Sequence, residues 1–220
     1  MRDFGNRVAV KVCGITNIND ALACAAEGVE MLGLNFSPKS PRYISREVAA
    51  EIVAAVRKES PQTKLVGVFV NQDMAFVNAT AEELSLDAVQ LHGDESPAYT
   101  RDVKASFVIK ALRVGPEFVA AAASEYECDA ILLDTWNASV PGGTGVTFPW
   151  SIAATLRPTV KRLILAGGLT PSNIVDAIQT VRPFAVDVCS GIEDAPGRKN
   201  RVLLRDFLDA IRVMKLGVIT

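Results

Sequence analysis

The stretch that decides the fold is Val8–Thr16, VAVKVCGIT. Its β-branched residues alternate along the chain and predict a strand: Val8, Val10 and Val12. Cys13-Gly14 ends that strand, and Asn17 can cap a helix because apolar residues follow it at helical spacing. Cys13 is therefore either a small buried hydrophobic residue or a thiol on the rim where a strand ends.

The size and charge of the chain limit the classes of protein that it can belong to. With 220 residues and 49% hydrophobic content, it can bury a sizeable core, and we expect a single catalytic domain over residues 1–220. The formal net charge of −2 gives no reason to expect nucleic acid or an anionic membrane as a partner. A small-molecule substrate fits this composition, with the chain as a monomer or a homodimer.

The cysteines indicate the compartment. They are scattered and form no CxxC pair: Cys13, Cys24, Cys128 and Cys189. With one histidine in the chain, metal-site spacing is absent and we expect no metal. A reduced, cytoplasmic protein fits best. No apolar run approaches the length of a membrane span, and the start, MRDFGNR, has no hydrophobic signal core.

One unit, a strand followed by a helix, repeats along the chain. After the first strand, seven more are predicted at Met31–Phe36, Lys64–Val70, Ala88–Leu91, Phe107–Leu112, Ala130–Leu133, Leu163–Ala166 and Phe184–Val188. The helices between them include a weak one over Glu95–Lys104, one that Pro116 opens and one that starts at Pro171. Eight such units predict a single (β/α)₈ barrel, with a doubly wound sheet as the second choice because it leaves open edges.

Two glycine-containing loops follow the last two predicted strands: Ala166–Pro171 and Cys189–Glu193. Barrels commonly bind phosphate at this position, through backbone N–H groups and a helix N-terminus. Each loop alone also fits a tight turn. Together, at the two expected positions, they favour a phosphate site. The segment Thr135–Pro149 is long for a connection in a compact domain, which is typical of a functional loop.

Cys13 and Asp134 end the first and sixth predicted strands, so a barrel places them across its mouth from each other. A thiolate can take a proton from carbon, and a carboxylic acid can deliver one to oxygen. The alternatives are a core thiol and an aspartate that caps the loop behind it.

Three more charged or titratable residues lie at the end of a predicted strand or in the loop after one. Arg42, in the loop SPKSPRY, can clamp a carboxylate with two hydrogen bonds or lie solvated on the surface. His92 can orient a substrate or bind neighbouring loop carbonyls. Asp187 points either into the mouth or towards a helix, and spacing does not decide between these.

Seven motifs, in order along nearly the whole chain, resemble the phosphoribosylanthranilate isomerase family of tryptophan biosynthesis: VKVCGIT, LNFSPKSPRYIS, VQLHGDE, LLDT, GGTG, LAGGLTPSNI and VDVCSGIEDAPGRKN. The resemblance implies a (β/α)₈ barrel, no cofactor, and an Amadori rearrangement of N-(5-phosphoribosyl)anthranilate. It also implies roles: Cys13 as general base, Asp134 as general acid and Arg42 on the anthranilate carboxylate. From their positions in the sequence, we also expect His92 and Asp187 to bind the substrate. The loops at Gly167-Gly168 and Ser190-Gly191 match the phosphate site of the family, and we expect Gly145 to contribute to it as well.

The chain departs from the family pattern in three places. Val146 follows GGTG where lysine is frequent, VCS stands where a second serine is common, and PGRKN replaces PGIKD. None removes a group implied in catalysis. Two other functions fit part of the sequence: another phosphosugar barrel enzyme such as indole-glycerol-phosphate synthase, and a non-catalytic sensor of a phosphorylated ligand. Indole-glycerol-phosphate synthase relies on catalytic lysines near the first strands, whereas Lys11 lies inside a predicted strand rather than at its end.

Overall fold

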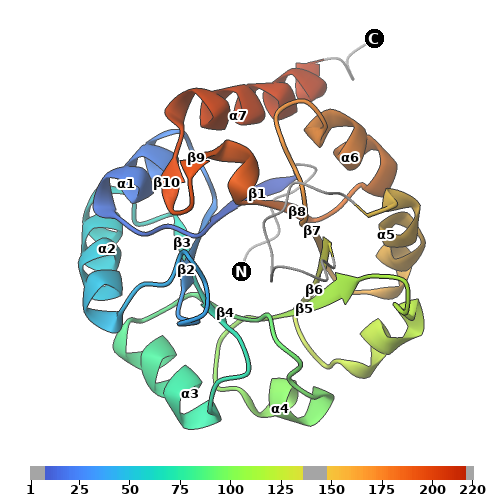
Figure 1. Ribbon diagram of the computed structural model, residues 1–220, viewed down its shortest axis with the longest axis horizontal. Helices are drawn as coiled ribbons and strands as arrows, with labels where there is room; N and C mark the ends of the chain where they lie inside the picture. The colour runs from blue at the N-terminus through green and yellow to red at the C-terminus, as the bar shows by residue number, and fades with distance from the viewer. Residues whose placement is uncertain (1–7, 136–147, 217–220) are drawn as a thin grey trace.

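The computed structural model describes residues 8–135 and 148–216, and these form a closed barrel of eight parallel strands in chain order (Figure 1). The strands are β1 (Ala9–Cys13), β2 (Met31–Asn35), β3 (Lys64–Phe69), β4 (Ala88–Leu91), β5 (Val108–Val114), β6 (Ala130–Thr135), β7 (Leu163–Leu165) and β8 (Ala185–Val188). Closure comes from the pairing of β1 with β8, in which Lys11 lies opposite Asp187. The predicted barrel is confirmed, and the doubly wound sheet is excluded.

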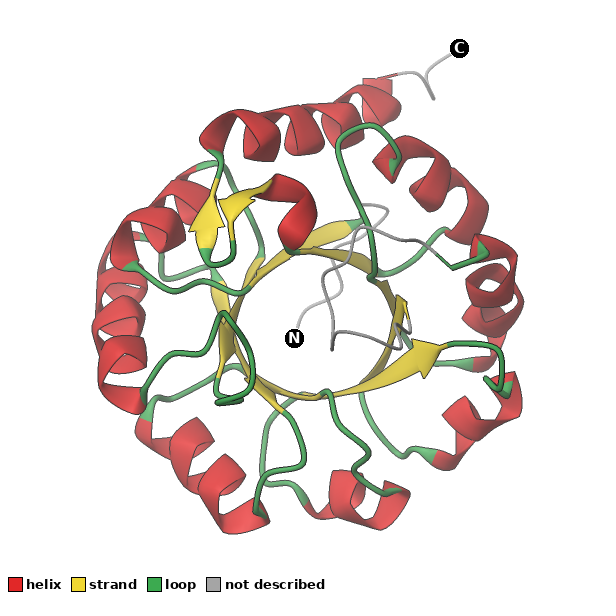
Figure 2. Cartoon of the chain, viewed as in Figure 1, coloured by secondary structure: helices red, strands yellow, loops and turns green. Residues whose placement is uncertain are grey.

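Helices surround the barrel (Figure 2). In the described ranges they are α1 (Ile18–Ala26), α2 (Arg46–Glu59), α3 (Met74–Glu83), α4 (Pro97–Asp102), α5 (Trp150–Leu156), α6 (Ile174–Val181) and α7 (Arg201–Leu216). Asn17 caps α1 as predicted, since its side chain accepts a hydrogen bond from the Asp20 N–H. No helix in residues 8–135 or 148–216 is both long enough and apolar enough to cross a membrane.

Three helices differ from their predictions. A 3₁₀ helix, Ala120–Glu125, lies between β5 and β6 instead of an α-helix opened by Pro116, and Gly115-Pro116 lie in a turn before it. The predicted Glu95–Lys104 helix shortens to α4 because the Ser96 side chain accepts the Tyr99 N–H and so fixes its start. Helix α6 begins at Ile174 rather than Pro171, because Asn173 holds the preceding turn through Thr170 and Gly168.

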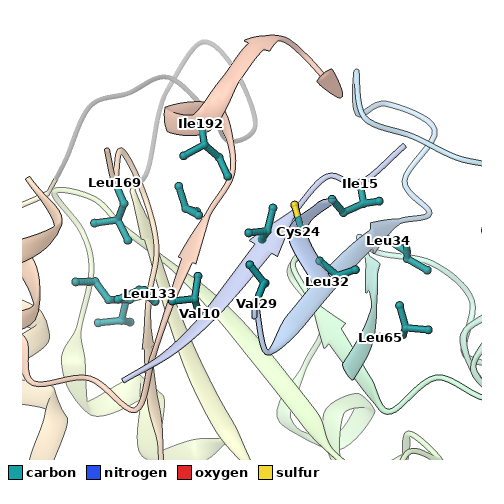
Figure 3. Packing of buried hydrophobic residues seen from close by; sticks show 14 of the residues in the cluster. Val10, Ile15, Cys24, Val29, Leu32, Leu34, Leu65, Leu133, Leu169 and Ile192 are labelled. Carbon is teal, nitrogen blue, oxygen red and sulfur yellow. The ribbon is translucent and has the colours of Figure 1, made fainter. Parts of the chain in front are cut away.

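Side chains alternate between two apolar clusters. Outward-facing strand residues such as Val10, Leu32 and Leu133 pack with the helices in the larger cluster, part of which Figure 3 shows. Residues one position away, such as Ala9 and Met31, form a smaller cluster inside the barrel. The period of two therefore decides which residues face the barrel interior.

One further element follows β8. A short antiparallel hairpin, β9 (Glu193–Ala195) and β10 (Arg198–Lys199), lies between β8 and α7 (Figure 1). The sequence does not predict it, since each strand is too short to show an alternation. The hairpin brings Glu193 and Lys199 to the carboxyl end of β1.

Candidate active site

The inner face of the barrel carries the chemically reactive side chains at its carboxyl end. Cys13 and Asp134 lie near the ends of β1 and β6, which are separated by β7 and β8 on one side of the ring. Cys13 is partly exposed, whereas Asp134 is 8% exposed. The two groups thus lie at the barrel mouth on different sides of its axis, as the sequence predicts.

Below Cys13, a buried ion pair crosses from β1 to β8. Lys11 Nζ donates to Asp187 Oδ2 at 2.7 Å, and both side chains are almost inaccessible to solvent. Burial raises the pKa of Asp187 to about 7, although the Lys11 ammonium opposes this shift. Residue spacing does not decide whether Asp187 points into the barrel or towards a helix. The ion pair with Lys11 shows that it points into the barrel.

The surroundings of Cys13 favour its thiolate. A hydrogen bond from the Cys189 thiol lowers the pKa of Cys13 well below its usual value, and the charges of Lys11, Lys199 and His92 add to this effect against the opposing effect of burial. Cys189 shows the opposite behaviour, because its hydrogen bond to Cys13 and its burial raise its pKa. These two shifts favour the thiolate at Cys13 and the thiol at Cys189.

Two cations share one carboxylate beside this thiol. Glu193 accepts hydrogen bonds from Arg42, at 3.0 Å from Nε and 2.6 Å from Nη2, and from Lys199 Nζ at 2.7 Å. Burial alone would raise the pKa of Glu193, but these two cations lower it. Lys199 Nζ also donates to the Cys13 carbonyl at 2.5 Å. The hairpin thus ties Arg42 to the end of β1.

Arg42 lies inward, over the turn that follows Cys13. Gly14 has a φ of +73°, and a Cβ at this position would collide with the Arg42 side chain. The Arg42 side chain is only 11% exposed. Its loop is held in part by Ser40 Oγ, which accepts the Arg42 N–H and a hydrogen bond from Asn35 Nδ2. The structure therefore does not support the solvated-surface interpretation of Arg42.

His92 connects β4 with β6. Its Nε2 lies 3.1 Å from Asp134 Oδ2, and its Nδ1 lies 2.8 Å from Gln90 Nε2. Because the Gln90 amide donates to Nδ1, the proton of a neutral imidazole lies on Nε2 and points to Asp134. Asp134 Oδ1 accepts the Thr135 N–H at 2.8 Å. His92 thus orients a side chain of the mouth rather than binding loop carbonyls.

The two predicted phosphate loops lie against each other and against Asp134. Gly167 has a φ of +86°, and a Cβ on it would collide with Thr135 and lie 2.9 Å from Asp134 Oδ1. A Cβ on Gly191 would collide with the Leu169 carbonyl of the neighbouring loop. Gly168 has a φ of +65°, and Ser190 begins a short 3₁₀ helix that includes Gly191. Gly145 and Val146 lie outside the described residues.

Four further polar residues lie in this region although the sequence does not predict them as site residues: Lys11, Cys189, Glu193 and Lys199. Two of them had a signal in the sequence. Lys11 is two residues from Cys13, and Cys189 is two residues from Asp187, so the strand period places each pair on one face. Glu193 and Lys199 had none, because their position depends on the hairpin.

Comparison with known proteins extends these observations. Residues 10–210 match the sequence profile of the family described as N-(5'phosphoribosyl)anthranilate (PRA) isomerase. The N-(5'-phosphoribosyl)anthranilate isomerase of Pelobacter propionicus is 46% identical over 201 residues, 91% of this chain and 94% of that protein.

Two solved structures share the fold. One holds mutually generated monomers of dimeric phosphoribosylanthranilate isomerase from Thermotoga maritima, with a TM-score of 0.83, 39% identity, and coverage of 94% of this chain and 99% of that one. The other is a phosphoribosylanthranilate isomerase in complex with reduced 1-(o-carboxyphenylamino)-1-deoxyribulose 5-phosphate, with a TM-score of 0.82, 39% identity and the same two coverages.

The closed barrel and the polar ring at its carboxyl end define the class of this protein as a (β/α)₈-barrel enzyme. Within that class, the chain belongs to the phosphoribosylanthranilate isomerase family. Its activity is accordingly that of an isomerase of tryptophan biosynthesis, and the family resemblance in the motifs is confirmed.

Proposed function

We propose that Cys13 and Asp134 carry the two proton transfers of the family reaction, which converts N-(5-phosphoribosyl)anthranilate into 1-(o-carboxyphenylamino)-1-deoxyribulose 5-phosphate. Asp134 protonates the ring oxygen of the furanose, and the ring opens to a Schiff base. The Cys13 thiolate then removes the C2′ proton, and the resulting enolamine tautomerises to the ketone. One acid and one base suffice for these steps.

The observation that carries this proposal is the environment of Cys13. A thiol at neutral pH is a weak base because most of it is protonated. Here the Cys189 thiol and the charges of Lys11, Lys199 and His92 lower the pKa of Cys13. Cys24 shows the contrast with a structural cysteine: it is fully buried, and burial raises its pKa to about 12.

The remaining contacts hold the substrate at both ends. Arg42 binds the anthranilate carboxylate, and backbone N–H groups near Gly167, Gly168, Ser190 and Gly191 bind the phosphate, with Gly145 in the loop after β6. His92 orients Asp134. Asp187 Oδ1 is buried without a hydrogen-bond partner among the described residues, so this oxygen is available for a substrate hydroxyl.

Loss of the fluorescent anthranilate substrate tests the proposal. The wild-type chain should turn over the substrate, and Cys13→Ser and Asp134→Asn should bind a product analogue without turnover. Binding without turnover by the wild type would instead support a phosphate-ligand sensor. Indole-glycerol-phosphate synthase activity is disfavoured because Lys11 is buried in its ion pair with Asp187 and lies below the mouth.

We also propose that residues 1–220 form a single catalytic domain, and that the protein is cytoplasmic and either a monomer or a homodimer. A relative from Thermotoga maritima is described as dimeric and as yielding monomers, which supports both states as options. Sedimentation equilibrium distinguishes the two states, limited proteolysis tests the single domain, and cell fractionation tests the compartment.

A further inference from the structure

Cys13 and Cys189 lie side by side on neighbouring strands. Val12 is the register partner of Val188, and each cysteine follows its valine directly. Two residues below, Lys11 and Asp187 are also register partners, and their side chains meet inside the barrel. Since the side-chain period of a strand is two, Cys13 and Cys189 project from the same face as that ion pair.

This placement lies within the reach of a disulfide bond. Neighbouring strands are about 4.7–4.9 Å apart, and disulfides join Cα atoms that are about 4.4–6.8 Å apart. The proximity of the Cys189 thiol lowers the pKa of Cys13, and Cys189 Sγ lies 3.8 Å from both Lys199 Nζ and Glu193 Oε1. Both cysteines are partly exposed, so a small oxidant can reach the pair.

The two other cysteines lack these features. Cys24 is fully buried in α1. Cys128 donates a hydrogen bond to the Ala130 carbonyl at 3.3 Å, and burial raises its pKa, so it reacts slowly as a nucleophile. A difference in reactivity between the cysteines is therefore built into their surroundings.

We propose that Cys13 and Cys189 form a peroxide-reactive site, in which hydrogen peroxide converts the two thiols into an internal disulfide. The Cys13 thiolate attacks one oxygen of the peroxide, the O–O bond breaks, and the products are a sulfenic acid and hydroxide. The Cys189 thiol then attacks the Cys13 sulfur, and water leaves as the S–S bond forms. Two sulfurs lose one electron each, and the peroxide is reduced.

Disulfide formation itself does not depend on the assigned catalytic roles, whereas the accompanying loss of isomerase activity rests on the proposed role of Cys13 as base. Oxidation removes the thiolate that accepts the C2′ proton. A thiol reductant restores it, because a disulfide is reversible and a sulfinic acid is not. Cys189 thus protects Cys13 from irreversible oxidation.

The experiment treats the full chain with hydrogen peroxide, blocks free thiols, and measures peptide masses without reduction. Wild type should lose two hydrogen atoms in mass and show a link between the tryptic peptides that contain Cys13 and Cys189. Because Cys13 and Cys24 fall in one tryptic peptide, fragmentation must assign the linked sulfur. A reductant should restore the activity in step with the loss of the link.

Two variants test whether the link requires Cys189. Cys189→Ser should form no link, and in excess peroxide a second equivalent should carry its Cys13 sulfenic acid to the sulfinic acid, so that its remaining activity is lost irreversibly. The matched control Cys128→Ser should form the link as wild type does. No link in wild type, a link through Cys24 or Cys128, or full rescue of Cys189→Ser by reductant would each overturn the proposal. A link in a chain that has no isomerase activity before treatment would leave this site standing and contradict the proposed function.

Discussion

Glu193 accepts hydrogen bonds from Nε and Nη2 of Arg42, so one edge of the guanidinium is bound within the protein. Lys199 binds the same carboxylate, and the cluster of two cations and one anion has a net positive charge. Arg42 is thereby held over the turn at Gly14, where a Cβ would collide with its side chain. A cation fixed beside Cys13, the proposed general base, suits a substrate that carries a carboxylate.

The first prediction concerns this clamp. Arg42→Lys should raise the KM for the anthranilate substrate by about 10–100-fold, since a charge-assisted hydrogen bond contributes roughly 1.5–3 kcal/mol and lysine cannot reproduce the planar fork. Steady-state kinetics measures the change. Arg46→Lys is the matched control, because Arg46, at the start of α2, forms an exposed ion pair with Glu83, at the end of α3. Equal KM values for wild type and Arg42→Lys would remove Arg42 from the carboxylate site.

The second prediction concerns the base. Cys13→Ser keeps the hydrogen-bonding group but ionises far less readily, so kcat should fall by about 10²–10⁴-fold while KM changes little. Circular dichroism should show an unchanged fold. If the serine variant retained most of its kcat, the thiolate mechanism would be abandoned.

The third prediction concerns the ionisation of Cys13. Its alkylation by iodoacetamide should reach half its maximal rate at a pH well below the usual thiol value of about 8.5. Lys199→Met should move this midpoint upward, because the variant loses a cation that favours the thiolate. The midpoint is read from the rate as a function of pH, with Cys128→Ser as the background variant. A midpoint at the ordinary value in wild type would contradict the stabilisation of the thiolate.

The sequence predicts the barrel and the ring of strand-end residues because both follow from local rules. Strand period and position assign Cys13, His92 and Asp134 to the inner face at the mouth. The sequence does not decide which face of the strand Asp187 occupies, because a shift of one residue in the strand register turns each side chain to the other face. The register pairing with Lys11 resolves it.

What the sequence does not predict depends on contacts between distant segments. Glu193 joins Arg42 across 151 positions, and Lys199 reaches the Cys13 carbonyl across 186 positions. No local pattern encodes either contact, because a hairpin of two very short strands creates both. The glycines show the same limit: both fit a phosphate site, yet a Cβ on Gly167 would meet Thr135 and the Asp134 carboxylate, and a Cβ on Gly191 would meet the backbone of Leu169.

The fourth prediction separates the acid from the base. Asp134→Asn should lower kcat by about 10²–10⁴-fold, since an amide cannot deliver the proton. Cys13 should remain open to alkylation in this variant, because Asp134 does not contribute to the hydrogen bond between the two thiols. Alkylation should slow when a product analogue is present. Loss of alkylation in Asp134→Asn would indicate that the substitution changes the structure of the barrel mouth and does not only remove an acidic group.

The last prediction concerns the ion pair between Lys11 and Asp187 beneath the site, and how the free energy of unfolding depends on pH when this pair is broken. Lys11→Met leaves Asp187 buried without its cation, which should lower the free energy of unfolding by roughly 3–5 kcal/mol at pH 8. The pKa of Asp187 is raised to about 7 by burial, above its unfolded value of about 3.9. A carboxyl group with a raised pKa is most compatible with the fold below its unfolded pKa, and this advantage is lost as the pH rises towards 7.

The cost of Lys11→Met should therefore be smaller at pH 5, where the buried carboxyl group is protonated, than at pH 8. Asp187→Asn should also cost less at pH 5 than at pH 8, because the wild-type carboxyl group is protonated at pH 5 and is then neutral like the amide. The double variant should be more stable than the sum of the two single losses predicts, since it leaves no unpaired charge. Urea unfolding at the two pH values measures all four proteins. A cost of Lys11→Met that is equal at pH 5 and pH 8 would show that Asp187 stays ionised throughout this range.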